Sequence, residues 1–135
     1  METVEELIEA MCADAVAIAQ DNFDVALDYS PASVEIVEEM LGGLHEAFKS
    51  KEGLEDAGQL ACCFGAYVGE CIRRANSDAS WCEEIPKEGF GYLVVTWRGQ
   101  QCFTLGWCNQ RITEGPEFDV WDTFKAMLES VLTKE

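Results

Sequence analysis

Basic residues are scarce in this chain of 135 residues, which has 9 Lys and Arg against 26 Asp and Glu and a formal net charge of −17 at pH 7. Such a charge opposes direct binding to nucleic acid phosphates or to anionic lipid, so we expect neither as a primary function. The excess of acid does not indicate disorder, because 48% of the residues are hydrophobic and disorder requires low hydrophobicity. The length is typical of one domain, which we predict to comprise residues 1–135.

Long apolar runs are missing as well. The longest uncharged apolar run, Leu60–Gly69, has about half of the ~20 residues that a transmembrane helix requires. The N-terminal segment METVEELIEA is acidic where a signal peptide would be basic. These features predict a cytoplasmic protein that does not contact a membrane.

Metal-binding patterns are absent from the sequence. His45 is the single histidine, and the cysteines lack the paired C-x-x-C spacing of zinc sites. An odd number of cysteines cannot pair completely within one chain, so we expect reduced thiols that pack as small apolar side chains. The seven cysteines are Cys12, Cys62, Cys63, Cys71, Cys82, Cys102 and Cys108. We expect neither a metal nor another cofactor.

Catalytic motifs are equally absent. The sequence has no phosphate-binding P-loop, no G-x-G-x-x-G after a strand, no H-E-x-x-H and no G-x-S-x-G. A nucleophile also needs an activating base and an orienting group, and no local motif places His45 in such a group. We therefore predict no catalytic residue, and a small enzyme with a site around Glu70 is kept as an alternative.

Helical periodicity predicts three helices in the N-terminal part of the chain, at about residues 3–21, 30–48 and 54–74. Thr3 and Glu6 fit a capping box at the start of the first helix. Ser30 and Pro31 fit the start of the second, with Ser as the N-cap and Pro at the first helical position. The third helix is apolar or small nearly all round, which predicts that it is central and buried.

Small residues recur along the third predicted helix at Gly58, Cys62, Gly65 and Gly69. A face of small residues allows a neighbouring element to pack at short distance. We therefore expect close packing against this face.

The period changes from helical to extended after the third helix. Residues 91–97 and 101–107 are rich in β-branched and aromatic side chains, which predicts a hairpin with Gly99 at positive φ. We expect a further edge strand at residues 81–85, and we expect residues 108–112 to extend or follow the second hairpin strand. Asp119 is expected to cap a last helix. The predicted order is α-α-α-β-β(-β)-α, an α+β fold with helices packed on a small antiparallel sheet.

The segment from Phe64 to Arg74 reads F-G-A-Y-V-G-E-C-I-R-R, and Trp81 and the predicted hairpin follow it. The pattern F-G-x-Y-x-G-E-x-I-R-R with a following Trp and hairpin resembles a family of small uncharacterised bacterial proteins. The resemblance covers about residues 60–120, and Cys71 departs from the aliphatic residue expected there. It implies a fold and a bacterial or phage origin, and it implies no activity.

Glu70 lies in a nearly all-apolar helix, where an ionised carboxylate needs a partner. Arg73 and Arg74 follow at three and four residues, the spacing at which side chains on a helix meet. We predict a structural ion pair of Glu70 with Arg73 and Arg74 that orients the helix against the sheet. Tyr67 is a further candidate contact of this group.

Acidic residues are concentrated in residues 1–60, which contain 15 acids and 2 bases. If the first two helices pack side by side, their carboxylates form one face that would steer a basic protein partner. The predicted partner-binding residues are Glu5, Glu6, Glu9, Asp21, Asp24, Glu35, Glu38, Glu39 and Glu46.

The resulting hypothesis is a non-catalytic cytoplasmic binding protein, and an immunity-type inhibitor of a toxin is the leading form. One alternative is a nucleic-acid mimic of the phage anti-defence type, which would block a DNA- or RNA-binding protein. A purely solubilising role for the acids is a further alternative. Four tryptophans and an uncovered hairpin edge leave both a monomer and a homodimer open.

Overall fold

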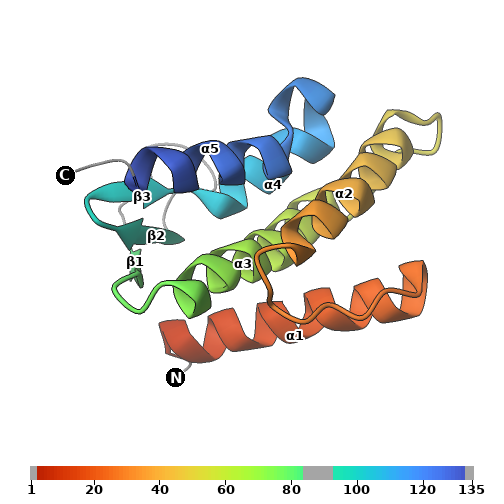
Figure 1. Cartoon of the computed structure of the whole chain (residues 1–135). Helices are drawn as coiled ribbons and strands as arrows, with labels where there is room; N and C mark the ends of the chain where they lie inside the picture. The colour runs from red at the N-terminus through yellow and green to blue at the C-terminus, as the bar shows by residue number, and fades with distance from the viewer. Residues whose placement is uncertain (1–2, 84–92, 133–135) are drawn as a thin grey trace.

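The computed structural model describes residues 3–83 and 93–132, and it has the α+β fold that the sequence predicts (Figure 1). The helices are α1 (Val4–Phe23), α2 (Ser33–Lys49), α3 (Ala57–Ala75), α4 (Thr104–Thr113) and α5 (Val120–Leu132), and the strands are β1 (Ser80–Glu83), β2 (Leu93–Trp97) and β3 (Gln100–Cys102). A short 3-10 turn, η1 (Pro116–Phe118), joins α4 to α5. Within the described ranges, no helix is both long enough and apolar enough to cross a membrane.

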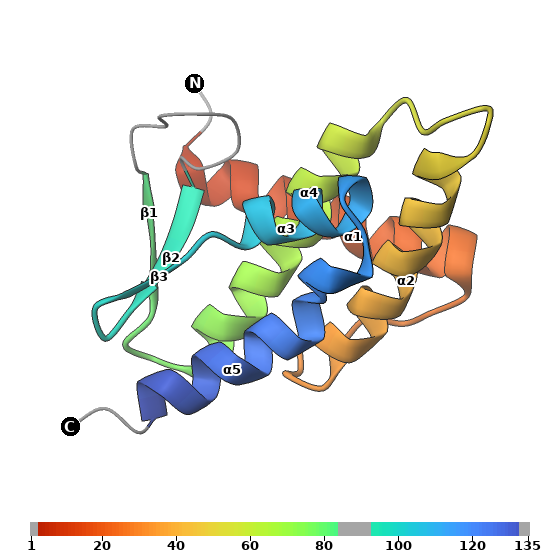
Figure 2. The ribbon, with the colours of Figure 1, turned by 90° about the horizontal axis from the view of Figure 1, so that it is seen from above.

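Helix α3 is the central element, as its apolar composition predicts. It packs against α1 on one side and against α4 on the other, while α2 packs against α4 and α5. Phe64 and Tyr67 of α3 are fully buried. The sheet lies at one end of the molecule, and the C-terminal part of α2 lies at the other (Figures 1 and 2).

Two glycines of α3 allow the close packing that the small-residue pattern predicts. A Cβ placed on Gly65 would lie 2.4 Å from the Cα of Leu105 in α4. A Cβ placed on Gly69 would lie 2.2 Å from Cη2 of Trp81 in β1. Both distances are far below van der Waals contact, so α4 and Trp81 occupy space that any larger residue would need.

The three strands form an antiparallel sheet in the order β1-β2-β3. Trp81 pairs with Val95, and Val95 pairs with Cys102. Arg98 and Gly99 form the two-residue turn between β2 and β3, with φ of 51° and 82°. Two successive positive φ values are those of a type I′ turn, so the predicted positive φ of Gly99 is confirmed.

The predicted second hairpin strand, residues 101–107, is wrong beyond residue 102, and so is the predicted extension over residues 108–112. The chain instead enters α4, in which Leu105, Cys108 and Ile112 are buried at helical spacing. This apolar stripe packs against α3 at Gly65, and tertiary packing overrides the local β preference. Residues 84–85 and 91–92, which the sequence also assigns to strands, lie outside the described residues.

Local capping explains where several helices begin. The Thr3 hydroxyl accepts a hydrogen bond from the Glu6 N–H at 3.1 Å, and the Asp119 carboxylate accepts one from the Asp122 N–H at 2.8 Å. The α-helical part of α2 begins at Ser33, whose N–H donates to the Ser30 hydroxyl at 3.2 Å. Ser30 therefore caps a preceding turn, and α2 starts later than the sequence predicts.

Candidate functional site

The buried carboxylate of Glu70 is the centre of a polar cluster at the C-terminal end of α3. Arg73 donates to it twice, from Nε to Oε1 at 2.6 Å and from Nη2 to Oε2 at 2.9 Å. Arg74 Nε donates to Oε2 at 2.9 Å, and the indole N–H of Trp81 donates to Oε1 at 2.9 Å. The structure thus brings Glu70, Arg73 and Arg74 together, and each carboxylate oxygen accepts two hydrogen bonds.

These donors determine the protonation state of Glu70. Burial alone would raise its pKa, but hydrogen bonds from Arg73, Trp81 and Arg74 outweigh burial and lower the pKa from 4.5 to about 2. The carboxylate is therefore ionised at neutral pH and has no free lone pair of good geometry. Such a group is a poor general base.

The aromatic ring of Tyr29 also holds Arg74 in place. The guanidinium carbon of Arg74 lies 3.7 Å from the centroid of the Tyr29 ring, which is a cation–π contact. Tyr29 in turn lies against Tyr67, with ring centroids 4.7 Å apart. Tyr67 does not join the Glu70 cluster as expected, because its hydroxyl bonds to the Ser33 hydroxyl at 2.7 Å and accepts the Tyr29 N–H at 2.8 Å.

A pocket of about 580 Å³ opens beside this cluster. Its walls come from the N-terminal half of α1, the C-terminal end of α3, β1 and the segment before each of α2 and β1. The lining residues are Glu5, Ile8, Glu9, Cys12, Tyr29, Glu70, Arg73, Arg74, Ala79, Ser80 and Trp81. We call this the α3-end pocket.

Helices α1 and α2 do not pack side by side along their whole lengths, because α1 packs mainly on α3 whereas α2 packs mainly on α4 and α5. Glu5 and Glu9 line the α3-end pocket, to which α2 contributes no residue. Glu6 is exposed near the start of α1, and Asp21 and Asp24 are exposed at its other end. Glu5 and Glu9 are therefore separated from the acids of α2, whereas the C-terminal end of α1 approaches α2, where the Phe23 ring lies beside Gly43.

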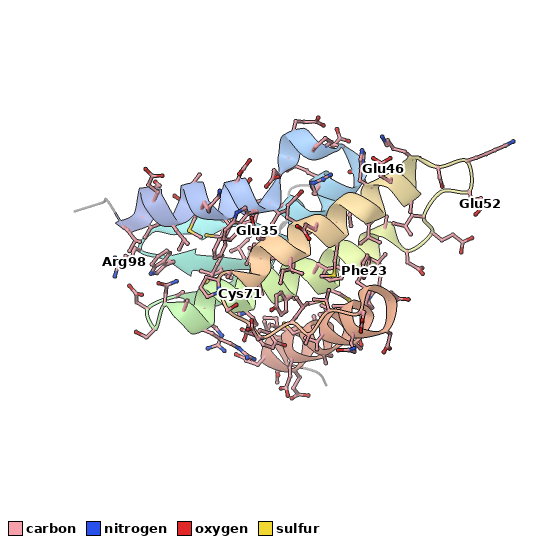
Figure 3. The ribbon with its side chains drawn as sticks, turned by 45° about the vertical axis from the view of Figure 1, so that its right-hand side comes forward. Phe23, Glu35, Glu46, Glu52, Cys71 and Arg98 are labelled. Atoms are coloured by element: carbon pink, nitrogen blue, oxygen red, sulfur yellow. The ribbon has the colours of Figure 1, made fainter. Side chains whose placement is uncertain are left out.

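Three exposed carboxylates follow one side of α2 at Glu35, Glu39 and Glu46. Figure 3 shows Glu35 and Glu46 at separate positions along this helix, and Glu52 in the loop beyond it. Gly43 occupies the intervening helical position between Glu39 and Glu46. We call Glu35, Glu39 and Glu46 the α2 acidic row.

Glu38 is not a surface residue, which corrects its assignment to the partner-binding face. Its Oε2 accepts a hydrogen bond from Arg111 Nε at 2.7 Å, and its Oε1 accepts one from the Val120 N–H at 2.8 Å. The side chains of Glu38 and Arg111 are almost completely buried, with relative exposures of 11% and 9%. Glu38 points inward because it lies on the apolar side of α2, next to Val37 and Leu41.

Sequence reasoning missed this buried pair of Glu38 and Arg111. The sequence does contain a sign of it, because Arg111 lies on the same side of a helix as the apolar residues Cys108 and Ile112. The spacing of these residues has meaning only in a helix, and the β-rich composition of the segment concealed it. Tyr29 was missed for a related reason, since nothing local places it over Arg74.

The cysteines are all free thiols. Burial raises the pKa of Cys12 to about 12 and that of Cys71 to about 11, so these thiols stay protonated and unreactive at neutral pH. Among residues 3–83 and 93–132, no group of three metal-ligating side chains is close enough to hold an ion. His45 is buried, and its Nδ1 lies 2.7 Å from the Ile112 carbonyl, to which it donates.

Comparison with protein-family models, with curated proteins and with solved structures finds no match for this chain. The function of the chain must therefore be inferred from the α2 acidic row and the α3-end pocket.

Proposed function

We propose that the chain is a non-catalytic cytoplasmic binding protein that presents the α2 acidic row to a basic protein partner, in the manner of an immunity protein that blocks a toxin. The observation that carries this proposal is the distribution of basic groups. Within the described part of the chain, every Lys and Arg side chain except that of Lys51 contacts a carboxylate of the same chain.

These internal pairs leave most of the exposed acid unneutralised. Arg73 and Arg74 contact Glu70, and Arg111 contacts the buried Glu38. Arg98 and Lys125 contact acids away from α2. Among the described residues, only Glu46 of the row has a basic contact, Lys49 at 3.3 Å. Both of those side chains are largely exposed, and an exposed pair of this kind is worth at most about 1 kcal/mol, so a partner can replace it.

The spacing of the row favours a protein partner over nucleic-acid mimicry. A helix rises about 1.5 Å per residue, so Glu35 and Glu39 are separated by about 6 Å along the axis. That step is similar to the phosphate spacing of a nucleic acid strand. Glu39 and Glu46 are separated by about 10 Å along the axis, because Gly43 interrupts the row. Uneven carboxylates suit a specific set of basic side chains better than they imitate a regular backbone.

The alternative of an enzyme around Glu70 has less support. Glu70 already accepts four hydrogen bonds and has a pKa of about 2, whereas a general base should have a pKa near the working pH. The thiol that lines the pocket, Cys12, has a raised pKa and is not a ready nucleophile.

The test compares two variants of equal net charge. The first is Glu35→Gln/Glu39→Gln/Glu46→Gln, and the control is Glu6→Gln/Glu9→Gln/Asp14→Asn, which neutralises three exposed acids of α1 away from the end of that helix that meets α2. Each protein is used to capture partners from the source organism at low salt, and the captured partner is then purified and its affinity measured. We expect the α2 variant to bind about tenfold more weakly than the control, mainly through a slower association rate.

A growth assay tests the toxin-inhibitor form of the proposal. Co-expression of the chain with the captured partner should relieve toxicity, and the α2 variant should relieve it less. The proposal is overturned if the α2 variant binds as well as the unchanged chain, or if no partner is captured. A captured nucleic-acid-binding protein that DNA or RNA displaces would replace it with nucleic-acid mimicry.

A further inference from the structure

The α3-end pocket holds two arginine side chains in fixed positions. Arg73 is held by two hydrogen bonds to Glu70, and Arg74 is held by one hydrogen bond to Glu70 and by the Tyr29 ring. Both guanidinium groups still have N–H donors to offer. These bonds leave one terminal nitrogen of Arg73 and two of Arg74 without a partner among the described groups. Their side chains are 43% and 48% exposed, so the unused N–H groups can reach a ligand.

This arrangement suits recognition of a carboxylate. A guanidinium binds a carboxylate through paired N–H groups, and the cost of ordering the side chain is reduced when the protein already fixes it. The buried charge of Glu70 is already compensated by two arginines, which leaves an excess of one positive charge on the cluster. Glu70 therefore positions the arginines without cancelling both of them.

Two carboxylates line the same pocket on its α1 side. Glu5 and Glu9 lie one turn apart on α1, and neither is within 4.0 Å of an arginine nitrogen in the described structure. A simple anion would be repelled by them and by the net charge of −17. A ligand that also carries an ammonium group would satisfy both walls.

The rest of the lining is compatible with an apolar group between the two charged walls. Ile8, Ala79 and Trp81 are on the pocket surface, and the volume of about 580 Å³ is within the range of small-molecule sites. The Trp81 indole is itself fixed by its hydrogen bond to Glu70 and by its contact with Gly69. The pocket therefore combines a cationic wall, an anionic wall and a rigid apolar surface.

We infer that the α3-end pocket binds a small zwitterion of the α-amino acid type, as a free amino acid or a short peptide. Its carboxylate binds Arg73 and Arg74, its ammonium group binds Glu5 and Glu9, and its side chain packs on Trp81. This site is separate from the α2 acidic row and does not depend on the proposed function.

Calorimetric titration of the full chain tests the inference, first with each of the common α-amino acids and with their glycyl dipeptides. The best binder is then compared with its N-acetyl derivative, which lacks the ammonium group, and with its amide, which lacks the carboxylate. We expect each derivative to bind at least about tenfold more weakly, a difference of about 1.4 kcal/mol. The indole N–H resonance of Trp81 should shift on binding of the zwitterion.

A matched pair of variants separates the pocket from general electrostatics. Glu5→Gln/Glu9→Gln should lose about tenfold in affinity. The control Glu6→Gln/Asp14→Asn, which removes two exposed acids of the same helix outside the pocket, should bind as the unchanged chain does. The inference is overturned if no amino acid or dipeptide binds, if either derivative binds as tightly as the zwitterion, or if the control loses affinity to the same extent.

Discussion

At the scale of single residues, Glu70 connects a helix to the sheet. Arg73 and Arg74 come from its own helix, whereas Trp81 comes from β1. The same carboxylate therefore fixes the last turn of α3 and attaches the first strand to it. A buried carboxylate with a full set of donors is stable in its ionised form only while all of those donors are in place.

The pH dependence of stability measures this contribution. The pKa of Glu70 is about 2 in the folded state against the ordinary value of 4.5, so its stabilisation is complete above pH 4.5 and is lost as the pH falls toward 2. At 1.36 kcal/mol per pKa unit, the full contribution is about 3 kcal/mol. Urea denaturation measures the unfolding free energies of the unchanged chain and of Glu70→Gln. The difference between them should become smaller as the pH falls from 4.5 to 2.

Glu35→Gln is the control for that experiment, because Glu35 is exposed and makes no described side-chain contact. We expect its unfolding free energy to stay close to that of the unchanged chain at neutral pH. A difference for Glu70→Gln that is the same at pH 7 and at pH 2 would contradict the assigned role of Glu70.

The residue scale also shows what local sequence can predict. The contacts of Glu70 with Arg73 and Arg74 follow from helical spacing, so the amino-acid sequence alone predicts them. The contact of Tyr29 with Arg74 joins segments far apart in the chain, and no local spacing encodes it. The separation of Glu5 and Glu9 from the acids of α2 is not encoded locally either, because it depends on which helix α1 packs against.

At the scale of elements, the position of α4 depends on the absence of a side chain at Gly65. A Cβ there would meet the Leu105 backbone, which cannot move without moving the whole of α4. Gly65→Ala should therefore destabilise the fold by about 1–3 kcal/mol, although alanine favours a helix more than glycine does. Thermal and urea unfolding measure the loss.

Gly106→Ala is the matched control within α4. A Cβ on Gly106 would have its nearest neighbour, the Phe103 Cβ, at 3.9 Å, which is ordinary contact. This variant should gain up to about 1 kcal/mol from helix propensity. If Gly65→Ala also gains stability, the close approach of α3 and α4 is not as tight as described.

Some helices can be predicted from the sequence and others cannot. The first three helices have long and regular apolar periods, and their existence follows from those periods. Residues 104–113 contain only a short apolar pattern among aromatic and β-branched neighbours, which local preference assigns to a strand. These residues form a helix rather than a strand because a helix packs into the space beside Gly65, and that space exists only in the folded molecule.

At the scale of the whole molecule, the net charge of −17 destabilises the folded state through repulsion between carboxylates. The described basic side chains lie mainly in internal pairs, so they do not neutralise the exposed acids of α1 and α2. Added salt screens repulsion between exposed charges, so the melting temperature should rise with sodium chloride concentration. A gain of 1 kcal/mol corresponds to about 4 °C for a domain of this size.

The variant Glu35→Gln/Glu39→Gln/Glu46→Gln gives the comparison for this measurement. With three fewer acids it should start from a higher melting temperature at low salt and rise less as salt is added. A melting temperature that falls with salt would mean that attractive pairs outweigh the repulsion.

The buried contacts of Glu38 have a consequence for the synthesis of the chain. Its partners, Arg111 and Val120, lie 73 and 82 residues later in the sequence. While the ribosome is producing the intervening segment, α2 has a carboxylate on its apolar side with no cation to meet it. The N-terminal helices therefore cannot complete their packing before residues 111 and 120 have emerged from the ribosome.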